Sequence, residues 1–383
     1  MASRPLSIVC AVAVVALLVA DGAVVAVRLG GDDGRQVPAA LEAVLPELEA
    51  FVERERGLRF ERPVDVRLAS NDDFDEALRR LRRGDGGEND QFADQQDIVI
   101  RLLRTLGLIE GDLDLAAIEE STDERVLGFY DAERDRLLVR GARLTPAVRR
   151  VLVHELTHAL DDQRFDLDRP EVDQRDDESA LAFQALVEGS ASLVESRYFA
   201  SLPADARRQA DIEADPVPSG QDVPRVFEAL LSFPYLAGES FVDSVIRNEG
   251  RERLDRAFAA PPTSSKEILH PERFLAGERP RPVRIPPSDR RAVDGGVLGE
   301  LVLRLVLQSS IDRASATRAA DGWGGDRYVA WDDRDGRLCV RVDVVVVSPA
   351  DRSELLDALR RWAQRHPGAA VADGEAVRLT RCA

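Results

Sequence analysis

One short stretch, residues 149–160, constrains this chain more than any other, because it contains the pattern His-Glu-x-x-His at His154, Glu155 and His158. An α-helix advances about 100° per residue, so residues four apart project from the same face, one turn apart. Two neutral imidazoles in that relation can bind one Zn²⁺. The glutamate between them points to the side of the metal, where its carboxylate can act as a general base on a water molecule.

The residues around the motif predict that it lies on a helix. Thr145 supplies a hydroxyl N-cap, and Pro146 suits the first helical position. Apolar residues recur at helical spacing, largely on the side away from the two histidines: Val148, Leu152, Val153, Leu156, Ala159 and Leu160. The alternative is a chance match on a core helix, but the chain has only four histidines, and two of them stand at ligand spacing.

A catalytic zinc site usually has three protein ligands, and Glu188 is our candidate for the third. It lies on the next long predicted helix, residues 178–199, among the apolar residues Leu186, Val187 and Ala191. An unpaired buried carboxylate is costly, and metal ligation would compensate it. The alternative is a glutamate on the helix surface, which is how we interpret Glu195.

Composition indicates a soluble globular body and argues against a nucleic-acid partner. Apolar residues make up 44% of the chain and charged residues 32%, and the net charge is −18. A strongly acidic chain lacks the basic surface that attracts phosphate groups.

The first 35 residues form a separate segment. Residues 6–27 are almost wholly apolar, after a short start that carries Arg4 and with a break at Asp21. Residues 6–20 fit the core of a signal peptide, while residues 6–27 are long enough to cross a membrane. No small-residue cleavage site follows, so we favour an uncleaved, single-pass anchor in the cell membrane over a secreted protein. Either interpretation puts the body outside the cytoplasm.

The cysteines agree with an extracytoplasmic body. Cys10 lies inside the apolar run, and only Cys339 and Cys382 remain in the body. An even pair suits one disulfide in an oxidising compartment, and the alternative is two buried free thiols.

Two further parts of the pattern bear on a site. Residues 126–130 and 136–140 read as strands of a hairpin just before the motif helix, and its free edge could pair with an extended peptide. Downstream, the pattern predicts two helices, residues 223–231 and 239–248, with Pro234 and Tyr235 in the connection between them.

The motif from His154 to His158, followed by Glu188, resembles the gluzincin group of zinc metallopeptidases. More closely, five stretches taken in order resemble an uncharacterised family of membrane-anchored bacterial zinc metallopeptidases. They are residues 128–131, 154–160, 186–191, 263–271 and 322–328. Together they cover roughly residues 120–330, and the resemblance implies a zincin-like catalytic domain with a small mixed sheet above the active-site helix. We expect this α+β, mainly helical domain to extend over residues 36–290. Residues 291–383 then form a C-terminal βαβ-like section packed on it.

The chain departs from the gluzincin pattern at one position. Many gluzincins carry an aspartate four residues after the ligand glutamate, where it orients a ligand histidine. Here that residue is Ser192, so another group must take this part. Asp161, Asp162 and Asp177 are the candidates, and the sequence does not rank them.

The sequence therefore predicts an extracytoplasmic zinc endopeptidase with one Zn²⁺ held by His154, His158 and Glu188, acting on polypeptides. Glu155 is the predicted general base. The oxyanion needs a second electrophile, for which His270, Tyr130 and Tyr235 are candidates; we favour His270. Two alternatives stay open: a metallohydrolase of non-peptide substrates, and a non-catalytic envelope binding or scaffold protein that contains zinc.

Overall fold

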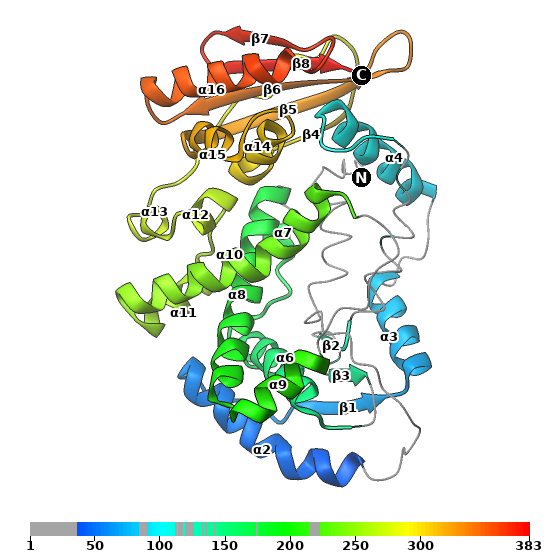
Figure 1. The fold of residues 1–383 in the computed structure, drawn as a ribbon, viewed down its shortest axis with the longest axis vertical. Helices are drawn as coiled ribbons and strands as arrows, with labels where there is room; N and C mark the ends of the chain where they lie inside the picture. The colour runs from blue at the N-terminus through cyan, green and yellow to red at the C-terminus, as the bar shows by residue number, and fades with distance from the viewer. Residues whose placement is uncertain are drawn as a thin grey trace.

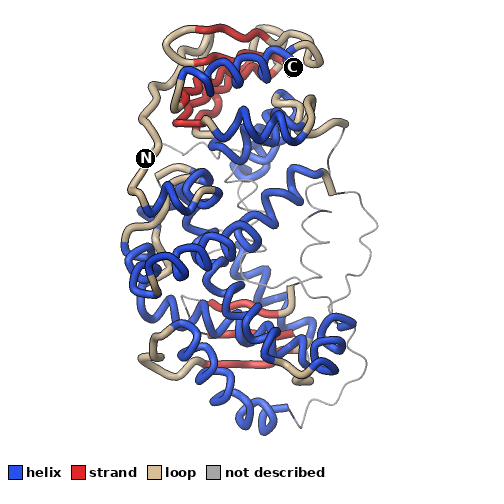
Figure 2. Tube along the Cα trace, turned by 60° about the vertical axis from the view of Figure 1, so that its left-hand side comes forward, coloured by secondary structure: helices blue, strands red, loops and turns tan. Residues whose placement is uncertain are grey.

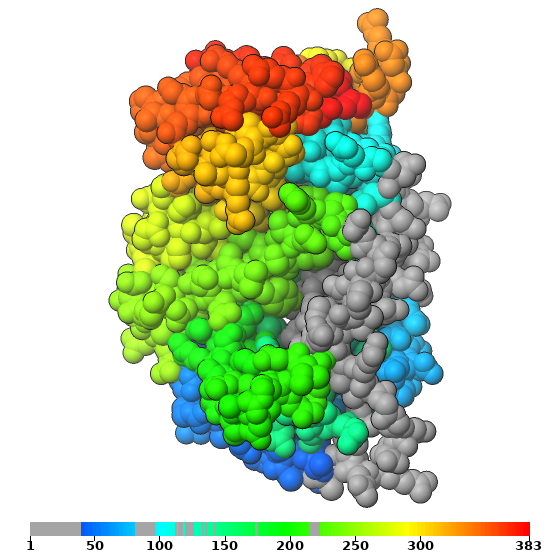
Figure 3. Space-filling view, in the orientation of Figure 1, coloured from blue at the N-terminus to red at the C-terminus, as the bar shows by residue number. Residues whose placement is uncertain are grey.

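The structure, a computed structural model, describes residues 37–83, 90–111, 113, 118, 126–131, 134, 136–140, 143–173, 175–213 and 223–383. Within these ranges the chain is an α+β protein with more helix than strand and two small sheets, as predicted. Figures 1 and 2 show an elongated molecule with one sheet near each end and helices between them. In the space-filling view, α2 and the C-terminal section lie at opposite ends (Figure 3).

The proposed membrane segment, residues 1–35, lies outside the described ranges. Within those ranges, no helix combines the length and the apolar character needed to cross a membrane.

The N-terminal end is built on a three-stranded mixed sheet in the order β1-β3-β2. Strands β1 and β3 are parallel, and β2 and β3 form the predicted antiparallel hairpin. The sheet packs on the helix that carries the histidine motif, which confirms the small mixed sheet expected there. The elements of this end are α2 (Val37–Arg56), β1 (Asp65–Ala69), α3 (Asn71–Arg83), β2 (Gly128–Asp131) and β3 (Arg136–Arg140).

The middle layer is helical, and its long helix α8 contacts both α6 and α10. Apolar side chains of the three helices fill two buried clusters. The helices of this layer are α6 (Pro146–Phe165), α7 (Pro170–Asp173), α8 (Asp177–Ser201), α9 (Ala204–Glu213), α10 (Arg225–Glu249), α11 (Arg251–Ala259), α12 (Ser265–Leu269) and α13 (Pro271–Leu275).

The prediction of two helices flanking Pro234 is wrong, because α10 runs unbroken through this residue. A proline inside a helix removes one hydrogen bond and costs about 3 kcal/mol. The buried residues Phe227, Leu230, Phe233 and Phe241 keep helical spacing across the proline, so packing against α8 outweighs that cost. Tyr235 is consequently a helical residue rather than part of a loop.

The C-terminal section is a five-stranded antiparallel sheet in the order β4-β5-β6-β8-β7. The βαβ-like unit expected here exists in a split form: β6 and β7 are joined through α16, and β8 lies between them, antiparallel to both. Helix α4 (Asp90–Thr105) packs on β6 from the N-terminal half of the chain. The elements of the section are β4 (Ala292–Gly296), α14 (Gly299–Gln308), α15 (Arg313–Asp321), β5 (Trp323–Asp332), β6 (Leu338–Val346), α16 (Pro349–Ala363), β7 (Ala370–Asp373) and β8 (Val377–Cys382).

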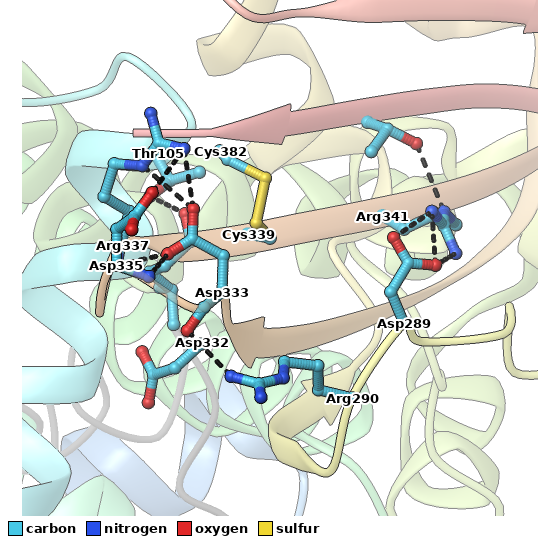
Figure 4. Close-up of a disulfide and its surroundings, with 12 residues drawn as sticks. Thr105, Asp289, Arg290, Asp332, Asp333, Asp335, Arg337, Cys339, Arg341 and Cys382 are labelled. Atoms are coloured by element: carbon cyan, nitrogen blue, oxygen red, sulfur yellow. Dashed lines mark hydrogen bonds and ion pairs between the residues drawn. A yellow bond between two sulfur atoms is a disulfide. The ribbon is translucent and has the colours of Figure 1, made fainter.

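The predicted disulfide is present. Cys339 on β6 and Cys382 on β8 are directly opposite in the strand register, and their sulfur atoms are bonded (Figure 4). The bond attaches the last strand of the chain to the middle of the sheet.

Candidate metal centre

Helix α6 presents the two histidines as the sequence predicts. The Thr145 hydroxyl accepts a hydrogen bond from the Val148 N–H at 3.3 Å, and Pro146 is the first helical residue. The rings of His154 and His158 lie 4.7 Å apart between centroids. Both side chains are buried, with 0% and 4% of their surface exposed.

Helix α8 brings Glu188 to the same point. Its start is capped by Asp176, whose carboxylate accepts a hydrogen bond from the Ser179 N–H at 2.8 Å. Glu188 Oε2 lies 3.2 Å from His154 Nε2 and 3.6 Å from His158 Nε2. Two imidazole nitrogens from α6 therefore converge on one carboxylate oxygen from α8.

This donor set fits a divalent metal. One potential ligand atom from each of the three residues lies within 4.8 Å of the others. His158 Nε2 is buried and makes no hydrogen bond within the described ranges, so this nitrogen is available to a metal ion. Two neutral imidazoles and one carboxylate are a known set for catalytic zinc.

The electrostatics of the three residues also favour a cation. Burial opposes protonation of His154, yet hydrogen bonds to Glu188 and Glu195 hold the pKa of His154 well above its usual value. Burial would raise the pKa of Glu188, but the charge of His158 and the hydrogen bond to His154 lower it. The carboxylates thus stabilise positive charge at the point where the imidazole nitrogens meet.

Glu155 is the next residue after His154 on α6 and lies under the edge strand of the mixed sheet. Its side chain is fully buried. Strand β2 comes closest to it at Gly128, where an added Cβ would stand 2.6 Å from Val151 Cγ1 and 3.3 Å from Glu155 Cγ. Only a glycine lets the strand approach this closely.

Tyr235 is the candidate electrophile that the structure places next to the histidines. Its ring lies 6.2 Å from the ring of His154 between centroids, with 30° between the planes. The close crossing of α10 and α8 brings it there: a Cβ on Gly238 would stand 2.1 Å from Ala185 O, and one on Gly189 2.2 Å from the Gly238 carbonyl carbon. Because Tyr235 precedes Gly238 by three residues, it lies on nearly the same face of α10.

Tyr130 has a different environment. It lies on β2, is 4% exposed, and donates its hydroxyl hydrogen bond to Asp162 Oδ2 at 2.9 Å. Asp162 also accepts from the Leu167 N–H at 3.0 Å. The hydroxyl thus ties the sheet to the end of α6.

His270 is placed away from the three candidate ligands. It stands between α12 and α13, which lie beside α14 and α15, whereas α6 lies at the other end of the molecule, beside the three-stranded sheet (Figure 1). Its Nε2 is 2.9 Å from Glu300 Oε1 and 3.2 Å from Asp321 Oδ1, both in the C-terminal section. Our preference for His270 as the oxyanion stabiliser is therefore wrong. Its imidazole is bound by two carboxylates of the C-terminal section and does not face the three candidate ligands.

The group of His270, Glu300 and Asp321 is itself within metal-binding range. However, Lys266 Nζ lies 4.0 Å from Glu300 Oε2, and Arg273 Nη2 lies 3.4 Å from Asp321 Oδ1. Positive charge is already supplied there, so we assign no metal to this group.

Glu195 is the residue beside the candidate ligands that sequence reasoning missed. It is only 8% exposed, and its Oε2 lies 3.1 Å from His154 Nδ1, while Arg150 Nη2 pairs with its Oε1 at 2.8 Å. The interpretation of Glu195 as a surface glutamate is wrong. A carboxylate on the second imidazole nitrogen of a ligand histidine fixes the tautomer and the orientation of the ring.

The three aspartates considered for this part do not contact His154 in the described part of the chain. Asp161 bonds to Arg56 and Ser190, and Asp162 bonds to Tyr130. The available signal was spacing: Glu195 follows Glu188 by seven residues, which is two helical turns and the same face.

Residues 286–382 match a family described as a domain of unknown function, DUF8575. This match covers the C-terminal section and not the residues around the histidine motif. No curated protein and no solved structure matches the chain.

Proposed function

We propose that this protein is a zinc-dependent endopeptidase that hydrolyses polypeptides outside the cytoplasm. The observation that carries the proposal is the convergence of His154 Nε2, His158 Nε2 and Glu188 Oε2 on one buried point, with Glu155 next to His154 on the same helix. These three residues would hold the zinc. Bound there, zinc supplies a Lewis acid that lowers the pKa of water toward neutrality and polarises a carbonyl group.

The roles of the chain's own residues follow from their positions. Glu155 accepts a proton from the attacking water and passes it to the nitrogen of the leaving amine. Glu195 holds His154 in the orientation that directs Nε2 toward Glu188, and Arg150 pairs with the other oxygen of Glu195.

Tyr235 is our candidate for stabilising the oxyanion that forms when water adds to the scissile carbonyl. A hydroxyl donor aimed at the developing charge lowers the barrier of acyl transfer. The stacking of Tyr235 on His154 supports this choice over Tyr130, whose hydroxyl is bonded to Asp162.

The disulfide supports the proposed compartment, because such bonds persist in oxidising surroundings. The proposed attachment to the cell membrane rests on residues 6–27 of the sequence. A secreted form is the alternative.

A structural zinc site in a scaffold protein is the second candidate function. The buried carboxylate of Glu155 beside the ligands argues against it, since a structural site needs no base. A metallohydrolase of non-peptide substrates would use the same four residues, so only substrate tests separate it from a peptidase.

The experiment is to measure zinc in the purified full-length protein and to follow cleavage of an unfolded protein such as reduced casein. The proposal expects about one zinc per chain, cleavage, loss of cleavage with a chelator, and recovery with added zinc. Zinc without cleavage of any polypeptide would favour the other two functions. Absence of zinc would contradict all three.

A further inference from the structure

The two helices that carry the candidate ligands are also joined by a buried hydrogen bond between Ser190 and Asp161. Ser190 Oγ on α8 donates to Asp161 Oδ2 on α6 over 2.6 Å, and each of the two residues is 1% exposed. Ser190 follows Glu188 by two residues, and Asp161 follows His158 by three. The bond therefore lies within one turn of a ligand on both helices.

The other oxygen of Asp161 is held by the N-terminal helix. Arg56, the last residue of α2, directs both Nε and Nη2 to Asp161 Oδ1, at 2.8 and 2.7 Å. The guanidinium carbon lies 6.0 Å from the ring centroid of Phe165 and 5.7 Å from that of Phe258. One carboxylate thus connects three helices, with Oδ1 bonded to α2 and Oδ2 to α8.

This arrangement restricts how α8 can move relative to α6. Arg56 is 2% exposed, so its charge and that of Asp161 are removed from water and strongly favour remaining together. Charge-assisted hydrogen bonds are short and directional, and both oxygens of Asp161 are occupied. A shift of α8 would break the bond from Ser190 and leave a buried carboxylate oxygen without its donor.

We propose that Arg56, Asp161 and Ser190 are positioning residues of the metal centre, which hold Glu188 at the distance from His154 and His158 that one metal ion requires. The proposal rests on the proposed function only in assuming that His154, His158 and Glu188 bind zinc. None of the positioning residues is itself a proposed ligand. Their effect is on zinc affinity, because a third ligand that is no longer held in place must be ordered each time the metal binds.

The test compares Ser190→Ala with Ser192→Ala in the full-length protein. Both serines are buried on α8, but only Ser190 bonds to Asp161. The dissociation constant for zinc is measured by competition with a chromogenic chelator, and the melting temperature is measured on metal-free protein. Loss of a residue that supports a ligand typically weakens metal binding by about 10- to 100-fold. We expect a rise of about tenfold or more for Ser190→Ala and an unchanged constant for Ser192→Ala.

A second pair of variants avoids the risk that a change at Asp161 prevents folding. Arg56→Lys keeps the charge but loses the two-pronged contact with Oδ1, and Arg54→Lys is the exposed control on the same helix. The first is expected to weaken zinc binding and the second to leave it unchanged.

A merely structural role would lower the metal-free melting temperature of Ser190→Ala and Arg56→Lys while leaving their zinc dissociation constants at the parent value. That outcome overturns the proposal, even if the parent is an active zinc peptidase. If the parent itself binds no zinc, both this proposal and the proposed function are wrong.

Discussion

At the scale of single residues, the two tyrosines near α6 form a natural comparison. Tyr235 stacks on His154, whereas the hydroxyl of Tyr130 is bonded to Asp162. Under the proposed function, Tyr235 would therefore take part in the reaction, and Tyr130 would contribute to packing.

We expect Tyr235→Phe to lower kcat for peptide cleavage by about 10²–10³, the usual loss for one oxyanion donor. Zinc content should be unchanged, because the tyrosine is not a proposed ligand. Tyr130→Phe is the control: it removes one hydrogen bond and should cost about 1 kcal/mol of stability, with kcat near that of the parent. Equal kcat values for Tyr235→Phe and the parent would remove Tyr235 from the reaction.

The position of the two histidines could be predicted from the sequence because helical period alone places His154 and His158 on one face. Glu188 needed a chemical argument, namely the cost of an isolated buried carboxylate. Glu195 was missed because α8 is buried on several faces, and which glutamates meet α6 depends on tertiary packing. For His270, residue type and position suggested chemistry, while the carboxylates of Glu300 and Asp321 that explain it come from distant sequence.

At the scale of elements, the crossing of α8 and α10 determines where Tyr235 lies. The sequence did not predict this crossing. Pro234 suggested a break in the helix, and nothing in the local sequence indicates that Gly189 and Gly238 face each other. The structure shows both backbones in contact at Gly189 and Gly238.

Gly238→Ala is therefore expected to push α10 away from α8. The added methyl group would stand 2.1 Å from Ala185 O, a backbone atom that cannot move without displacing the helix. Overpacking of this kind costs roughly 1–3 kcal/mol or more, and kcat should fall as Tyr235 moves from His154. The free energy of unfolding and kcat are measured together.

The matched control is Gly374→Ala, in the turn between β7 and β8, where the added methyl group meets only Ala376 O among the described residues, at 3.6 Å. It should leave both quantities near the parent value. Parent-like stability for Gly238→Ala would mean that the two helices are not in such close contact.

At the scale of the whole molecule, a buried carboxyl group lies where the central helices meet the C-terminal section. Glu178 Oε1 on α8 accepts from both the N–H and the hydroxyl of Ser265, at 2.6 Å each. A Cβ on Gly299, at the start of α14, would stand 2.1 Å from the Glu178 carboxyl carbon. Burial raises the pKa of Glu178 to about 8 against the hydrogen bonds from Ser265, and the charges of Asp326 and Asp176 add to the rise.

This shift predicts a loss of stability as pH rises. The unfolded carboxyl group has an ordinary pKa near 4.5, so between that pH and about 8 the folded protein binds a proton that the unfolded chain has released. Stability should fall over this window and level off above it. Glu178→Gln removes the dependence, so its melting temperature should exceed that of the parent increasingly from pH 5 to pH 8. Parallel melting curves for the two proteins across this range would show that the carboxyl group is not held protonated.

The division of the chain into sections was partly predictable. The antiparallel pairing of β6 and β8 brings Cys339 opposite Cys382, and cysteine count alone had suggested this bond. The insertion of β8 between β6 and β7 was not predictable, because local pattern shows that strands exist and not which of them are neighbours.

The measurement that tests the central claim most directly compares Glu155→Gln with Glu188→Ala for zinc content and peptide cleavage. Glu155→Gln keeps nearly the same volume and removes only the base, so we predict about one zinc per chain, a parent-like fold, and a loss of activity of roughly 10²–10⁴ or more. Glu188→Ala removes a proposed ligand and should lose both zinc and activity. Cleavage at the parent rate by Glu155→Gln, or full zinc and turnover in Glu188→Ala, would contradict the account.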